Sequence, residues 1–227
     1  MSSQTARIRA DLVESGLVWV IVGFAILIAL NLLTLAIGPS GILQNLNSRS
    51  WGALVSVFVF DSWGTVGGLA GVVILFTPVL FGMPRPRRFS LSIFFLCASI
   101  GSGILANVLW SYFYNRGGLI GAGSSSIAIS GQGIIFALSI FGSINLGVAS
   151  RKDGAKGADV AAREWRQFFF VVYITLILST LYFVVVLESI YIPTALYNWR
   201  VHEIGFFIAI AATAVFVGVT SRLTSIN

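Results

Sequence analysis

The chain has 227 residues, of which 57% are hydrophobic and only 10% are charged, and its mean hydropathy is +0.93. Soluble domains carry roughly a quarter charged residues, so this composition excludes an ordinary soluble globule as well as a disordered or collagen-like chain. The net charge of +6 would favour nucleic acid as the partner of a soluble protein. In so apolar a chain it indicates a basic membrane face instead, so we expect a lipid bilayer and no nucleic acid as partner.

Six apolar segments are close to the roughly 20 residues that a helix needs to cross a bilayer. They are residues 17–37, 66–81, 90–109, 131–149, 168–187 and 201–219. The first is too long for a cleaved signal peptide, and the acidic residues Asp11 and Glu14 precede it. The sequence therefore predicts an all-α, polytopic membrane protein with a tail at 1–16, a six-helix domain at 17–220 and a C-terminal end at 221–227.

The basic residues of the loops predict the orientation of these helices. Eleven of the 14 Lys and Arg residues fall in the N-terminal tail, the second loop, the fourth loop and the C-terminal end. The other three are Arg49, Arg116 and Arg200, in the intervening loops. Because cytoplasmic loops carry an excess of Lys and Arg, both termini are expected in the cytoplasm, with the protein in the cell membrane.

Two of the predicted outer segments have unusual compositions. Residues 38–64 form a long loop rich in aromatic side chains, namely Trp51, Phe58, Phe60 and Trp63. Aromatic rings with one polar edge favour the membrane interface, so this loop is expected to lie on the outer leaflet or dip into it. Residues 116–130 are rich in Gly and Ser, and irregular backbone at that depth indicates a cavity at the outer end of the fourth helix.

The single histidine, His202, begins the sixth predicted helix, with Gly205 and Ala209 on the same face. Such a stripe of small residues lets another helix approach closely. The predicted topology also brings Thr65 and Ser130 to the outer level of His202. A serine or an amide on the fourth helix facing His202 would form either a nucleophile and base pair or a structural hydrogen bond of the same geometry.

These features together resemble the rhomboid family, the six-helix intramembrane serine proteases. Family members carry a Trp-Arg pair in the first outer loop, where this chain has Trp51 and Gly52, and a Gly-x-Ser-Gly box that opens the fourth helix. Their sixth helix carries a histidine followed by glycines, which His202, Gly205 and Ala209 match well. The resemblance covers nearly the whole chain and implies a rhomboid-like bundle with an interfacial first outer loop.

The box on the fourth helix can be aligned in two ways. Read without a gap, Ser130-Gly131-Gln132-Gly133 puts Gln132 at the nucleophile's position, Phe136 beside the histidine, and Gly131 and Gly133 in helix packing. If the helix begins only after Ser130, that serine is the nucleophile instead. A two-residue offset turns a helical side chain by about 200°, so Ser130 and Gln132 cannot both face His202 from within a helix.

The resemblance also implies oxyanion-hole donors at the start of the second helix, at the positions of Thr65 and Leu69. Losing one such donor typically costs about a hundredfold in rate, and leucine can donate nothing.

We therefore expect a proteolytically inactive rhomboid-like protein that binds transmembrane segments of client proteins. The alternative is an active endopeptidase with a Ser130–His202 dyad. A transporter or channel is the third class, although the spans show no paired acids and no inverted repeat. No cofactor and no metal are expected.

Overall fold

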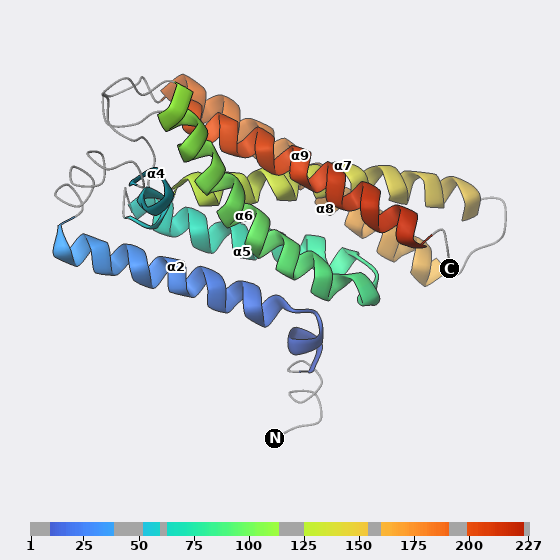
Figure 1. Cartoon of the computed structure of the whole chain (residues 1–227). Helices are drawn as coiled ribbons and strands as arrows, with labels where there is room; N and C mark the ends of the chain where they lie inside the picture. Colours follow the sequence, from blue (N-terminus) through green and yellow to red (C-terminus); the bar gives the residue numbers. More distant parts are fainter. Residues whose placement is uncertain are drawn as a thin grey trace.

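The computed structural model of this protein describes residues 10–38, 52–59, 63–113, 125–153, 160–190 and 199–224. Within these ranges the chain is almost entirely helical and contains no strand. The order of elements is α2 (Leu17–Ile37), α4 (Gly52–Val55), η1 (Ser56–Phe58), α5 (Trp63–Gly82), α6 (Arg85–Phe113), α7 (Ser125–Asp153), α8 (Val160–Ile190) and α9 (Trp199–Thr224). The six long helices form the bundle drawn in Figure 1.

Six of the described helices are long and apolar enough to span a membrane, which confirms the prediction of six spans and of an integral membrane protein. The spans are Leu17–Ile37, Trp63–Gly82, Arg85–Trp110, Ser125–Leu146, Arg163–Tyr182 and Val201–Thr220. Helix α2 begins at Leu17 as predicted, and the other five begin earlier than hydropathy alone predicts, because their first turns include polar or basic residues. The fourth span shows the shift that matters most, since its helix begins at Ser125 and not at Gly131.

Helix α7 is the central helix of the bundle. It contacts α5, α6, α8 and α9, and 67% of its most apolar window is buried, against 22–39% for the other five spans. Small and polar side chains on α7, including Ser126, Ser130, Gly131, Gly133 and Ser139, are buried against these neighbours. A helix surrounded by protein tolerates such residues because other helices, and not lipid, meet them.

Helix α2 lies along one side of the bundle against α5 and α6 (Figure 1). An aromatic stack joins the three helices, since Phe95 of α6 stacks on Phe24 of α2 at 5.7 Å and on Phe76 of α5 at 3.9 Å between ring centroids. Ahead of α2, the Ser92 hydroxyl donates to the carbonyl of Ser15 over 2.8 Å. These contacts hold α2 at one end and in the middle, while much of its remaining surface is exposed for lipid.

The described part of the first predicted outer loop packs into the bundle. Ser56 and Val57 of η1 are fully buried, and η1 contacts α2, α6 and α7. Trp63, at the start of α5, is 67% exposed, whereas Trp51 and Phe60 lie outside the described residues, as do residues 116–124 of the Gly- and Ser-rich segment. Residues 52–58 therefore form a short helical segment that packs against the bundle.

Tyr173 is one of the buried side chains through which helix α8 packs on the bundle, together with Phe169 and Leu176. Tyr173 lies against Gly82 at the end of α5 and against Gly142 of α7, so close that a Cβ atom at either glycine would collide with its ring or hydroxyl. The ring is almost fully buried. The absence of a side chain at both glycines thus makes room for Tyr173, because any side chain there would push α8 away from α5 and α7.

Candidate functional site

A close polar contact between two long helices joins Ser125 and His202. Ser125 is the first residue of α7, and His202 lies in the first turn of α9. The Ser125 Oγ is 2.8 Å from the His202 Nε2, within hydrogen-bond distance. His202 is only 3% exposed. The pair therefore sits at one end of the bundle, between the two helices that pack most extensively against each other.

Residues of α6 surround this pair on another side. Asn107 is fully buried, and its side-chain amide donates to the Gly103 carbonyl over 2.9 Å and to the Ser126 Oγ over 3.1 Å. Ala106 and Trp110 of the same helix form a small apolar cluster with Val201, the residue before His202. The first turn of α7 is thus held by a polar contact to α6, and the start of α9 by an apolar one.

The structure does not join Ser130 to His202, the dyad that the sequence offered as an alternative. Ser130 is fully buried, but its hydroxyl has no hydrogen-bond partner. It faces Gly205, where an added Cβ would lie 2.9 Å from the Ser130 Oγ. The reason is the early start of α7: five residues of helix turn Ser130 about 140° away from Ser125 and carry it about 7.5 Å along the axis.

Gln132 does not bond to His202 either, because it lies too far along the helix. Seven helical residues bring it back to the Ser125 side of α7, but about 10 Å deeper. Its Oε1 is buried with no hydrogen-bond partner. Phe136, one turn further, contacts Phe206 at 5.8 Å between ring centroids, so this aromatic side chain packs one turn past His202 and not beside it.

The four small residues singled out in the sequence all lie where α7 meets other helices. An added Cβ at Gly133 would lie 2.7 Å from the Phe206 carbonyl oxygen and 3.3 Å from the Ala209 Cβ. Gly205 faces Ser130, as described above. Gly131 points away from α9, because a Cβ there would lie 3.3 Å from the Ser99 Oγ of α6. Glycine thus permits the close approach of α7 to α9 on one side and to α6 on the other.

Thr65 and Leu69 lie in the first two turns of α5, and both are buried. This part of α5 packs against the first turn of α7, since an added Cβ at Gly68 would lie 3.4 Å from the Ala128 Cβ. The side chain of Leu69 has no hydrogen-bonding group to offer there. Leu69 therefore supplies no oxyanion donor, whereas the Thr65 hydroxyl is able to donate.

The arrangement has the chemistry of a nucleophile and its base. A serine hydroxyl that donates to a neutral histidine Nε2 can lose its proton to that nitrogen as it attacks a carbonyl.

Sequence patterns alone missed Ser125 because a run of serines beside glycines predicts a loop. The available signal was Gly123-Ser124-Ser125-Ser126, a Gly-x-Ser box with serine in place of the second glycine. Among the described residues, no three His, Cys, Asp or Glu side chains gather as a metal site requires.

Comparison with known proteins identified no relative of the chain. No protein-family model, no curated protein and no solved structure matches the chain.

Proposed function

We propose that this protein is an intramembrane serine hydrolase of the rhomboid type, with Ser125 as nucleophile and His202 as general base. The observation that carries the proposal is the 2.8 Å contact between the Ser125 Oγ and the His202 Nε2. Six candidate spans and the order of sequence features support it. It revises the expectation of an inactive protein, which rested on the altered positions of the nucleophile and of the oxyanion donors.

The reaction would follow the chemistry of a serine and histidine dyad. The Ser125 oxygen attacks the carbonyl carbon of a peptide bond while its proton passes to the His202 Nε2. The tetrahedral intermediate then collapses, the C–N bond breaks, and the imidazolium returns the proton to the leaving amine. Water, deprotonated by the same nitrogen, next hydrolyses the acyl-serine ester and frees the enzyme.

The start of α7 is suited to stabilise the negative charge of the oxyanion, which the apolar side chain of Leu69 cannot do. The first N–H groups of a helix have no acceptor within the helix, and the positive end of the helix dipole lies there. Ser125 is the first residue of α7, so the positive end of the α7 dipole would favour the negative charge that forms on the substrate carbonyl oxygen.

A second candidate function is non-catalytic binding of transmembrane segments from client proteins. The observation that favours it is Leu69, which is fully buried where the resemblance implies a donor. In this function the Ser125 and His202 contact is only structural. The buried Oε1 of Gln132 would accept a hydrogen bond from a polar side chain of the client, a contact that two transmembrane helices use to associate.

Labelling with a fluorophosphonate tests the first proposal, because the probe forms a covalent bond with an activated serine. We expect the purified full chain to be labelled, and Ser125→Ala and His202→Ala to lose the label. Ser130→Ala is the matched control, since it removes a buried hydroxyl from the same helix without touching the pair. Absence of wild-type labelling beside a labelled active rhomboid, or labelling that survives Ser125→Ala, overturns the proposal.

Photo-crosslinking to single transmembrane peptides in proteoliposomes distinguishes the second candidate. If the protein is a binder, the wild type and Ser125→Ala capture the same peptides intact, and Gln132→Leu captures fewer of those with a polar mid-membrane residue. Cleavage of the peptide by the wild type alone excludes a purely non-catalytic role.

We further propose that the protein resides in the cell membrane with both termini in the cytoplasm, as the loop charges favour.

A further inference from the structure

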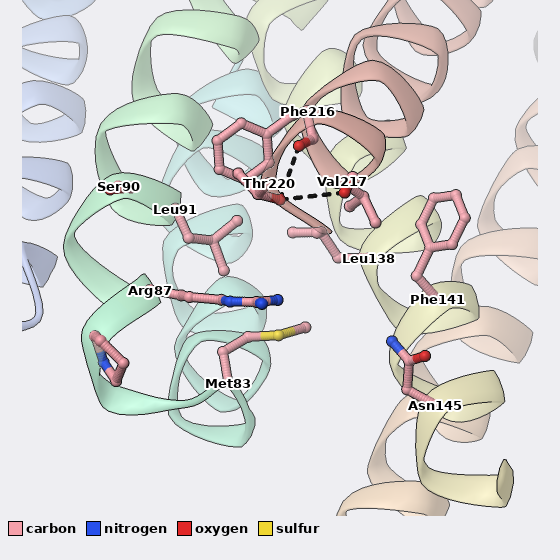
Figure 2. Close-up of a pocket in the computed structure, with 11 residues that line it drawn as sticks. Met83, Arg87, Ser90, Leu91, Leu138, Phe141, Asn145, Phe216, Val217 and Thr220 are labelled. Atoms are coloured by element: carbon pink, nitrogen blue, oxygen red, sulfur yellow. Dashed lines mark hydrogen bonds between the residues drawn. The ribbon is translucent and has the colours of Figure 1, made fainter. Parts of the chain in front are cut away.

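A cavity of about 240 Å³ opens at the end of the bundle opposite His202. It lies between the start of α6, the second half of α7 and the last turns of α9 (Figure 2). Its floor is buried and apolar, formed by Leu91 and Leu138, and its rim includes the exposed residues Arg87 and Asn145. This combination of an apolar floor and a basic rim is unrelated to the Ser125 and His202 pair.

Two arginines in the first turn of α6, Arg87 and Arg88, take different positions. The Arg88 Nε donates to the Met83 carbonyl over 2.9 Å and its NH2 group to the Phe81 carbonyl over 2.8 Å. Its guanidinium also lies over the Phe81 ring. Arg87 lines the cavity and extends from α6 into the space between α6 and α7, above Met83 and opposite Asn145 (Figure 2).

The charge and position of the cavity define its occupant. Among the described residues that line it, none is Asp or Glu, so none of these side chains repels an anion at Arg87. Arg87 lies near the start of one candidate span and Thr220 at the end of another, which puts the rim at the boundary between hydrocarbon and water. A ligand there must combine a negative group with an apolar part.

We infer that this cavity binds the headgroup of an anionic phospholipid, with the phosphate at Arg87 and the first methylenes of an acyl chain on Leu91 and Leu138. The volume is below the roughly 300–1,000 Å³ of pockets that enclose a whole drug-sized molecule, so the tails remain in the bilayer. The loop charges assign this end to the cytoplasm, the leaflet in which basic pockets between helices meet anionic lipids.

The test is native mass spectrometry of the full chain released from detergent with phosphatidylglycerol or phosphatidylcholine. We expect wild type to retain phosphatidylglycerol preferentially, and Arg87→Gln to retain about fivefold less, the ratio typical of one basic residue near an anionic surface. Arg85→Gln is the matched control, because it removes the same charge two residues away and does not line the cavity. Millimolar inorganic phosphate should not displace the lipid.

Two further variants keep the test decisive if Arg87→Gln fails to fold. Arg87→Lys should keep most of the lipid because it keeps the charge, and Val217→Trp should lose it because the indole fills the cavity with the charges intact. Equal losses in Arg85→Gln and Arg87→Gln would mean a diffuse basic surface and overturn the inference. Equal retention of the two lipids, undiminished binding in Val217→Trp, or displacement by free phosphate would overturn it as well.

Discussion

Asn107 of α6 donates its side-chain amide to the Ser126 Oγ of α7 over 3.1 Å, one residue past Ser125. The contact fixes the first turn of α7 from outside the helix. It also joins two elements that are separated in the chain by segment 114–124, which lies outside the described residues. The orientation of Ser125 toward His202 therefore depends on a residue of a third helix.

Asn107→Ala is expected to slow fluorophosphonate labelling at Ser125 at least tenfold, because the first turn of α7 loses its tether. It should also lower the free energy of unfolding by about 1–3 kcal/mol, since a buried partner is removed. The labelling rate and thermal unfolding of the purified protein measure the two effects separately.

Asn31→Ala controls for the loss of a buried amide. Asn31 is fully buried in α2, and its amide donates to the Leu27 carbonyl of the same helix over 2.8 Å. We expect a similar loss of stability and an unchanged labelling rate. If both variants slow labelling equally, Asn107 has no particular role in positioning Ser125.

Gly133→Ala is expected to destabilise the protein by about 1–3 kcal/mol, the usual cost of adding a methyl group to a tightly packed contact. The new Cβ would lie 2.7 Å from the Phe206 carbonyl oxygen, and a backbone atom cannot rotate aside. Helices α7 and α9 must then separate, which lengthens the Ser125 and His202 contact. Thermal unfolding in detergent, together with the labelling rate, measures both consequences.

Gly71→Ala provides the comparison for that prediction, because an added Cβ at Gly71 meets nothing within 4 Å. The alanine should be neutral or stabilising by up to about 1 kcal/mol, as its higher helix propensity predicts. A Gly133→Ala protein as stable as Gly71→Ala would show that the approach of α7 to α9 is not tight.

Ser130→Ala is expected to leave stability unchanged or to raise it by up to about 1 kcal/mol. The Ser130 hydroxyl is buried without a hydrogen-bond partner, so the native state already bears its desolvation cost. Thermal unfolding checks the direction of the change. A marked loss of stability would mean that the hydroxyl has a partner, and would return Ser130 to consideration as a functional residue.

The orientation can be measured with single cysteines in a Cys97→Ser background. Ser3→Cys and Gly157→Cys should react with a membrane-impermeant maleimide only after the cell membrane is opened, and Asn45→Cys should react in intact cells. This outcome is expected because eleven basic residues flank one side of the spans and three the other. The opposite labelling pattern would refute a cytoplasmic location for the termini.

Hydropathy predicted the six spans because lipid selects for long apolar runs, and this signal needs no knowledge of packing. It failed at the start of α7, where the serines predict a loop. Ser126 is helical and buried because Asn107 meets its hydroxyl, a contact between residues 19 apart in the chain. Ser125 and His202 are 77 residues apart in the chain. The pattern of small residues on one helix indicated that His202 faces a neighbouring helix, but it could not identify which residue His202 contacts. The aromatic segment at residues 38–64 was also beyond prediction from local sequence, because Val57 is buried by contacts of its short helix with three other helices.

The central position of α7 has a consequence for how this sequence can change over generations. On α2 and α8 the outward faces meet hydrocarbon, which asks only that a side chain be apolar, so leucine, isoleucine, valine and phenylalanine should exchange there with little effect. On α7 most side chains of the apolar window are buried against other helices, so volume as well as polarity is constrained there. A saturation scan of the chain should therefore find its least tolerant positions on the helix with the most serines and glycines, and its most tolerant ones on the most hydrophobic helix.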